Sequence, residues 1–225
     1  MEEVDGNKTQ KTERPVKMSE PPIIDFPVLN PEFIKLVSQQ TGIPYEIIDD
    51  LPFGKDWLVV IRLHALVEAA LNRMIVCALG DDRLTDIVTR MDTGDRTRGK
   101  LAFIKALDLL PKEARRYLTI LSTLRNDLVH DIEQFGFTFD KWAAAMKAEE
   151  RKSFRESTAF VSHWIGESTP LMKLAISLES GGWGPVTIRL SIMIPALAII
   201  GMAAEFVLKN RRSEVAQQQS TPKAE

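Results

Sequence analysis

The stretch from Lys55 to Leu79 constrains the fold most, because it is apolar around most of the circumference that a helix would present. Apolar side chains occupy most positions between Trp57 and Leu71. A helix that is apolar on nearly every side must be covered by several neighbours. Gly80 follows directly, and glycine is typical of the position after a helix end. The sequence therefore predicts an all-α protein in which this helix lies at the centre of a bundle.

One polar stripe interrupts the apolar surface of this helix. His64, Glu68 and Asn72 are spaced four apart, so they lie along one line of the helix. Two interpretations stay open at this point. The stripe faces water at a groove, or Glu68 or His64 faces polar residues of another helix.

A second predicted helix carries polar residues that lie outside its apolar seam, so packing of the helix does not explain them. It begins near Pro111 and includes the segment Leu121–Asp131, with an apolar seam at spacings of three and four formed by Tyr117, Leu121, Leu124, Leu128 and Ile132. Asn126 and His130 fall on the far side from this seam, one turn apart. Arg125 lies at the edge of the seam, and its long side chain is expected to reach round toward His130. We therefore expect solvent, a ligand or another helix on the second face.

The remaining segments extend the helical pattern. Residues 1–26 are predicted to be a disordered tail because they are polar, charged and proline-containing. Helices are expected over 31–40, 45–51, 81–91, 98–110, 138–146 and 149–165, with a strand-like aromatic connector over 135–139. Residues 27–180 would form the main helical domain. His163 has no polar companion nearby in the sequence and is interpreted as structural.

The chain ends with an apolar segment, predicted as a helix over residues 181–212 and followed by a disordered tail over 213–225. Residues 186–208 would measure about 34 Å as a helix, which is long enough to span a bilayer. Trp183 and the Lys/Arg residues after 208 resemble interface anchors, and Pro195 would kink the helix. A membrane segment and a buried bundle or dimer helix both remain open.

Composition excludes several classes of protein. The net charge is −2 and there is one cysteine, so neither a disulfide framework nor a cysteine-based zinc site is expected. A cytoplasmic protein is predicted, possible membrane attachment aside. The chain has no P-loop, dinucleotide fingerprint or zinc-binding histidine pair, so no metal and no cofactor are expected. Residues 96–125 contain eight Lys/Arg and two Asp/Glu, which indicates either a solvated face or a path for phosphates.

The segment Arg-Asn-Asp-Leu-Val-His at residues 125–130 resembles the hallmark of the HEPN superfamily, which is Arg, four to six residues, then His. The order of the preceding segments is also similar, with a long apolar helix and then Arg98-Gly-Lys-Leu-Ala-Phe-Ile-Lys-Ala-Leu-Asp-Leu-Leu. This order looks most like the branch related to mannitol-operon repressors, and the resemblance covers residues 50–145. It implies an antiparallel helical bundle that forms a homodimer through the motif face. Many members are metal-independent ribonucleases, often toxins of toxin–antitoxin pairs or defence effectors, whereas others only bind or regulate.

The resemblance implies catalytic roles for Arg125, Asn126 and His130. A histidine can transfer a proton when an RNA 2′-hydroxyl attacks the next phosphate, and an arginine can hold the phosphoryl oxygens. Glu68, Arg115 and Arg116 are expected in supporting or substrate-binding positions.

Three alternatives to catalysis remain open from the sequence. Arg125 and His130 could serve only as helix-end and salt-bridge residues, with Asp127 or Asp131 pairing with Arg125. The protein could be a non-catalytic interaction module. It could also be membrane-attached through residues 186–208. The expected partners are a second copy, RNA, an antitoxin or regulatory protein, and a membrane.

Overall fold

The computed structural model describes residues 31, 35, 38–39, 44–51, 54–130, 136–165 and 185–220, and helices are the only regular elements in these ranges. The prediction of an all-α protein is confirmed. The elements, in chain order, are α2 (Tyr45–Asp49), α3 (Asp56–Leu79), the 3₁₀ helix η3 (Asp82–Leu84), α4 (Thr85–Arg90), α5 (Lys100–Ala106), α6 (Lys112–His130), α7 (Phe139–Ala145), α8 (Ala148–Thr158), α9 (Phe160–Ile165) and α11 (Pro185–Ser220).

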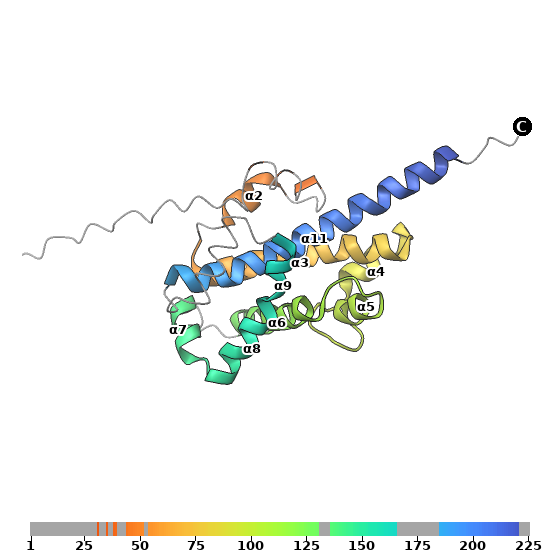
Figure 1. The fold of residues 1–225 in the computed structure, drawn as a ribbon. Coiled ribbons are helices and arrows are strands. Elements are labelled where there is room, and N and C mark those ends of the chain that lie inside the picture. The colour runs from red at the N-terminus through yellow and green to blue at the C-terminus, as the bar shows by residue number, and fades with distance from the viewer. Residues whose placement is uncertain are drawn as a thin grey trace, which may run out of the picture.

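Helices α3 and α11 form the centre of the molecule and run in the same direction (Figure 1). At one end Nη2 of Arg189 lies 3.0 Å from a carboxylate oxygen of Asp56, and at the other Nδ2 of Asn210 lies 3.7 Å from Sγ of Cys77. The bundle was predicted to be antiparallel, and this pair differs from that prediction. The amide of Phe139, at the start of α7, donates to the Asp56 carboxylate, so the chain has returned to the first turn of α3 well before α11 begins.

Helix α11 belongs to the same hydrophobic core as α3 and α6 and does not form a separate C-terminal unit. Pro195 lies inside α11 and lacks the amide hydrogen that would bond to the carbonyl one turn earlier. The neighbouring carbonyl of Ile192 accepts a hydrogen bond from the buried hydroxyl of Tyr117 on α6. The segment Ile188–Arg212 is long and apolar enough to cross a membrane, yet 78% of its most apolar 18-residue stretch is buried inside the protein. The helix continues to Ser220, past the predicted end at residue 212.

Helix α3 begins and ends within a residue of the predicted positions. Gly80 caps it in the left-handed conformation, with φ of 66°. Helix α5 ends at Ala106, before the predicted end at Leu110, because the chain turns at Asp108, where φ is 51°. The helix predicted over 149–165 is divided at Ala159 into α8 and α9.

Some predicted segments fall partly or wholly outside the described residues. The tail over 1–26 and the side chain of His163 lie outside them, as do most of the helix over 31–40 and Phe135 of the aromatic connector. The described part of that connector, from Gly136 onward, contains no strand, and Thr138 caps α7 by accepting a hydrogen bond from the amide of Lys141.

Candidate functional site

The predicted residues Arg125, Asn126 and His130 lie in the last turns of α6. Arg125 is half-buried, whereas Asn126 and His130 are exposed. Arg125 and His130 are five positions apart, which places them about 140° apart around the helix axis. Asn126 lies between these two positions, and the Arg125 guanidinium turns toward it.

Arg125 is held by a neutral partner. Its Nη1 donates to Oδ1 of Asn126 over 2.9 Å. Within the described part of the chain Arg125 makes no ion pair, and the alternative in which Asp127 pairs with it is wrong. Asp131, the other expected partner, lies outside the described residues. A guanidinium has five N–H donors, so most of its donors remain available.

Beside Arg125, the polar stripe of α3 enters a largely buried cluster that bridges α3, α6, the loop before α5 and the first residue of α5. We name it the polar cluster, and it consists of His64, Glu68, Thr93, Lys100 and Ser122. Nε2 of His64 is hydrogen-bonded to Oγ of Ser122 at 3.3 Å. Nδ1 of His64 lies 3.9 Å from a carboxylate oxygen of Glu68. His64 therefore faces α6. For this residue, the interpretation that the stripe faces polar residues of another helix is the correct one.

Lys100 anchors the other side of the polar cluster. Its side chain is fully buried, with Nζ 2.5 Å from Oε1 of Glu68 and 2.6 Å from the carbonyl oxygen of Met91. The hydroxyl of Thr93 donates to the same Glu68 oxygen over 2.9 Å. The negative charge of Glu68 is thus already balanced by the buried ammonium group of Lys100. Any influence of Glu68 on Arg125 is therefore indirect, through His64.

The surroundings keep His64 neutral and Glu68 ionised. Burial lowers the pKa of His64 below its ordinary value of 6.5. The charges of Arg125 and Lys100 lower it further, whereas Glu68 and Asp92 act in the opposite direction. For Glu68, burial raises the pKa, but the hydrogen bond and charge of Lys100, with help from the hydrogen bond of Thr93, leave it below the ordinary value.

The loop over residues 92–99 is tightly built and packs against α6. The Asp92 carboxylate accepts hydrogen bonds from the amides of Gly94 and Asp95, and the Asp95 carboxylate accepts from Thr97. Gly99 is required because a Cβ there would collide with the carbonyl oxygen of Asp92. A Cβ on Gly94 would lie 3.3 Å from Cβ of Ser122, which places the loop beside the polar cluster. The exposed Arg96 and Arg98 lie on this loop.

The two arginines predicted as supporting residues are engaged elsewhere. Nη1 of Arg115 donates to the carbonyl of Leu110 over 2.7 Å and lies 3.7 Å from the Asp108 carboxylate. Arg116 pairs with Glu156 of α8 at 2.9 Å. Arg116 is nine residues before Arg125, so it lies on the opposite side of α6. The structure therefore does not bring Arg116 to the motif residues, and Arg115 serves the start of its own helix.

Ser122, His64 and Glu68 are arranged in the same order as the nucleophile, base and carboxylate of a serine hydrolase triad. The arrangement here is structural and not catalytic. Ser122 is only 4% exposed and lies in the middle of a helix whose amides are already bonded. The Glu68 contact of 3.9 Å is too long for a hydrogen bond. No substrate carbonyl can reach this hydroxyl without opening the interface between α3 and α6.

The sequence did not reveal Ser122, Thr93 or Lys100 as members of the polar cluster. Lys100 lies 32 positions from Glu68 along the chain, and no local spacing connects them. The one sequence signal for this cluster was the run of turn residues before Lys100, which indicates that the chain reverses direction there. Among the described residues no group of three His, Cys, Asp or Glu side chains is arranged to hold a metal ion.

Comparisons with family models, with curated proteins and with solved structures found no match to this chain.

Proposed function

We propose that this chain is a HEPN-like protein that binds single-stranded RNA and cleaves it without a metal ion, using Arg125 and His130 in a cleft between two copies. The observation that carries the proposal is the state of Arg125. This guanidinium is half-buried and bonded to the neutral Asn126, and within the described ranges no carboxylate pairs with it. An arginine in this state is matched to an external anion, and phosphate takes its planar donors in bidentate fashion.

The charge around Arg125 supports the same substrate. Arg96 and Arg98 are exposed on the loop that packs beside Ser122, one turn before Arg125 on α6. Neither side chain forms an ion pair within the described part of the chain. Successive phosphates of a single strand can therefore meet several cations along this edge.

The proposed reaction needs only proton transfer and charge stabilisation. The RNA 2′-oxygen attacks the adjacent phosphorus while His130 accepts its proton, and the bond from phosphorus to the 5′-oxygen breaks. The leaving 5′-oxygen takes a proton from an imidazolium, which leaves a cyclic phosphate and a free 5′-hydroxyl. Arg125 stabilises the charge that builds on the phosphoryl oxygens. Asn126 keeps the guanidinium in place.

A second copy completes the proposed site. The backbone positions of Arg125 and His130 lie about 140° apart around α6, so we propose that each phosphate meets the Arg125 of one copy and the His130 of the other. Val129 lies between them and is 51% exposed, so it offers a second copy an apolar contact. Two motif faces in contact would bring the Arg125 of one copy toward the His130 of the other.

The test is cleavage of a labelled single-stranded RNA in the presence of a chelator, with wild type and His130→Ala compared. We expect His130→Ala to lower the rate by about 10² to 10⁴-fold, because it removes the proton-transfer group. Thr123→Ala, an exposed change on the same helix, is the control and should leave the rate unchanged. A folded dimer of the wild type that leaves the RNA intact would refute catalysis.

Two alternatives to cleavage remain proposals. The angular separation of Arg125 and His130 around α6 also suits a non-catalytic HEPN interaction or regulatory module, which would bind RNA or a protein partner without turnover. Membrane attachment through residues 186–208 has the support of the length and apolar composition of Ile188–Arg212, but requires this helix to leave the core. Full-length protein that stays in the supernatant after membranes are pelleted would exclude membrane attachment.

A further inference from the structure

A groove runs along the side of α6 that faces α7 and α8, away from Arg125. Two adjoining cavities form it, with volumes of about 380 Å³ and 430 Å³. Both are lined by Leu124, Asp127, Trp142 and Ala145, so they are continuous. We call this feature the α6–α8 groove.

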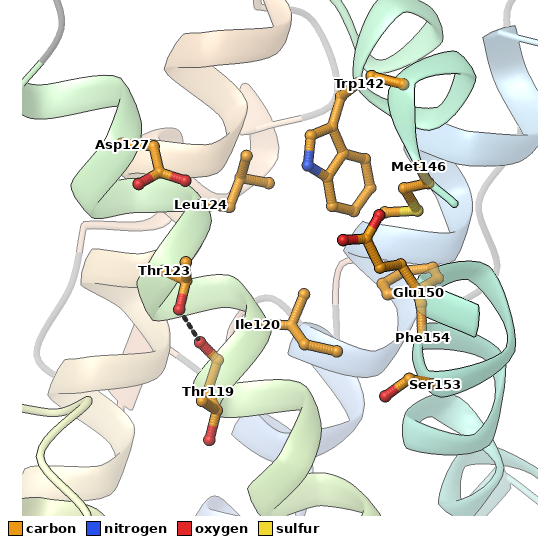
Figure 2. A pocket seen from close by; sticks show the side chains of 11 residues that line it. Thr119, Ile120, Thr123, Leu124, Asp127, Trp142, Met146, Glu150, Ser153 and Phe154 are labelled. Carbon is orange, nitrogen blue, oxygen red and sulfur yellow. Dashed lines mark hydrogen bonds between the residues drawn. The ribbon is translucent and has the colours of Figure 1, made fainter. Parts of the chain in front are cut away.

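The floor of the α6–α8 groove is apolar. Figure 2 shows side chains from α6 and from α7 and α8 converging on the space between these helices, and the apolar ones are Ile120, Leu124, Trp142, Met146 and Phe154. Trp142 is half-buried and rests edge-on against the ring of Phe154, with the ring centres 5.6 Å apart. This contact fixes the indole at the centre of the groove without covering it.

The rim of the groove carries more negative than positive charge. Asp127 on α6 and Glu150 on α8 line the first cavity, in which no Lys or Arg takes part (Figure 2). Lys141 is the one cation among the residues that line the second cavity. Asp127 is exposed and makes no hydrogen bond or ion pair to any described residue. An RNA backbone would meet two carboxylates here, so the charge disfavours nucleic acid and favours a cationic partner.

The length of the groove matches a helix. From Thr119 to Leu128 the groove follows α6 for about 13 Å, and the anchors of an amphipathic helix at positions i, i+4 and i+7 span about 10 Å. We propose that the α6–α8 groove binds a helical segment of a partner protein, with an apolar stripe set on Trp142 and Lys or Arg residues beside Asp127 and Glu150. A lysine or arginine of the partner also gains from a position over the indole face.

The test is direct binding of a synthetic probe to the full chain. The probe is a fluorescent, helix-stapled peptide of about 16 residues, with leucines at i, i+4 and i+7 and flanking lysines. Its twin carries glutamate in place of each lysine. We expect the basic peptide to bind at least tenfold more tightly than the acidic twin, with the difference shrinking as salt is raised.

Two variants place the peptide in the groove. Asp127→Lys should weaken the basic peptide roughly fivefold and strengthen the acidic twin, because an exposed charge contact is reversed. Thr123→Arg should weaken both peptides by more than tenfold, because the new side chain occupies the groove and can pair with Asp127 one turn later. Asp86→Lys makes the same charge change at an exposed residue of α4 outside the groove and should alter nothing. Thermal unfolding verifies that each variant folds.

Several results would overturn the proposal. These are absence of binding to the folded wild type, equal binding of the two peptides, and binding that neither Asp127→Lys nor Thr123→Arg weakens. Displacement of the peptide by single-stranded RNA would assign the groove to nucleic acid. A wild-type dimer that Thr123→Arg converts to monomer would assign it to a second copy. None of these measurements depends on RNA cleavage, so the proposal stands or fails separately from the proposed function.

Discussion

The polar residues of α3 and those of α6 have similar helical spacing but lie in opposite environments. His64 and Glu68 are partnered by residues from two other parts of the chain, namely Ser122 and Lys100. Arg125 bonds to its own neighbour Asn126, and His130 makes no hydrogen bond or ion pair to a described residue. Periodicity alone does not distinguish the two cases, because it reports which side of a helix a residue occupies and not what lies opposite.

This difference predicts two separate kinds of effect. Substitutions in the polar cluster should change the free energy of unfolding, because each side chain there satisfies a buried partner. Substitutions of Arg125 and His130 should change RNA binding or cleavage with little effect on folding. A variant that changed both together would break the comparison.

The largest effect on folding is expected for Glu68→Gln. It leaves the fully buried ammonium of Lys100 without its counter-charge, so the free energy of unfolding should fall by about 3 kcal/mol. Urea unfolding measures this. Arg62 lies on α3, the helix that carries Glu68, and pairs with the exposed Asp50. Asp50→Asn removes this charge pair and should lower the free energy of unfolding by less than about 1 kcal/mol. Equal losses of stability in the two variants would contradict a buried ion pair between Lys100 and Glu68.

A pH dependence follows from His64. Its folded-state pKa lies below the ordinary value of 6.5, so between these two values the unfolded chain binds more protons. Stability should therefore be complete above about pH 6.5 and fall as the pH falls, by about 1.4 kcal/mol for each unit by which the pKa is lowered. Glu68 adds a further loss only below its ordinary value of 4.5. His64→Gln should flatten the stability curve between about pH 7 and pH 5, and an unchanged curve would contradict the burial of His64.

A smaller effect is expected for Ser122→Ala, which deprives Nε2 of His64 of its hydrogen bond. The free energy of unfolding should fall by about 1 kcal/mol. The neighbouring Thr123 is exposed and its hydroxyl bonds only to the carbonyl of Thr119, so Thr123→Ala should change stability by less than about 0.5 kcal/mol. Thermal unfolding of the two variants side by side checks the difference.

The sequence was sufficient for the elements whose signals are local. Gly80 ends α3 at the predicted residue, and Thr138, the first residue of the helix predicted over 138–146, caps α7. The parallel pairing of α3 with α11 was not predictable, because it depends on contacts between residues more than a hundred positions apart, such as Arg189 with Asp56. The same contacts place α11 in the core, a choice that its apolar composition had left open.

The site was predictable only in part, for the same reason. The pattern identified Asn126 and His130 as residues that the core does not explain, and both are exposed, whereas Arg125 at the edge of the seam is half-buried. It could not identify Lys100 as the partner of Glu68, and it gave Arg116 a supporting or substrate-binding position although this residue pairs with Glu156 on the far side of α6. Charge counted along a sequence does not reveal which face of a helix carries it.

The most direct test of the account is the binding of a short single-stranded RNA to Arg125→Ala and Arg116→Ala, each over a range of salt concentrations. Both variants lose one positive charge from α6. If Arg125 is the arginine left for an external phosphate, its removal should weaken binding about tenfold and lower the slope of log affinity against log salt by about 0.7. Arg116→Ala should then bind like the wild type. Equal losses in the two variants, or no loss in Arg125→Ala, would contradict the account.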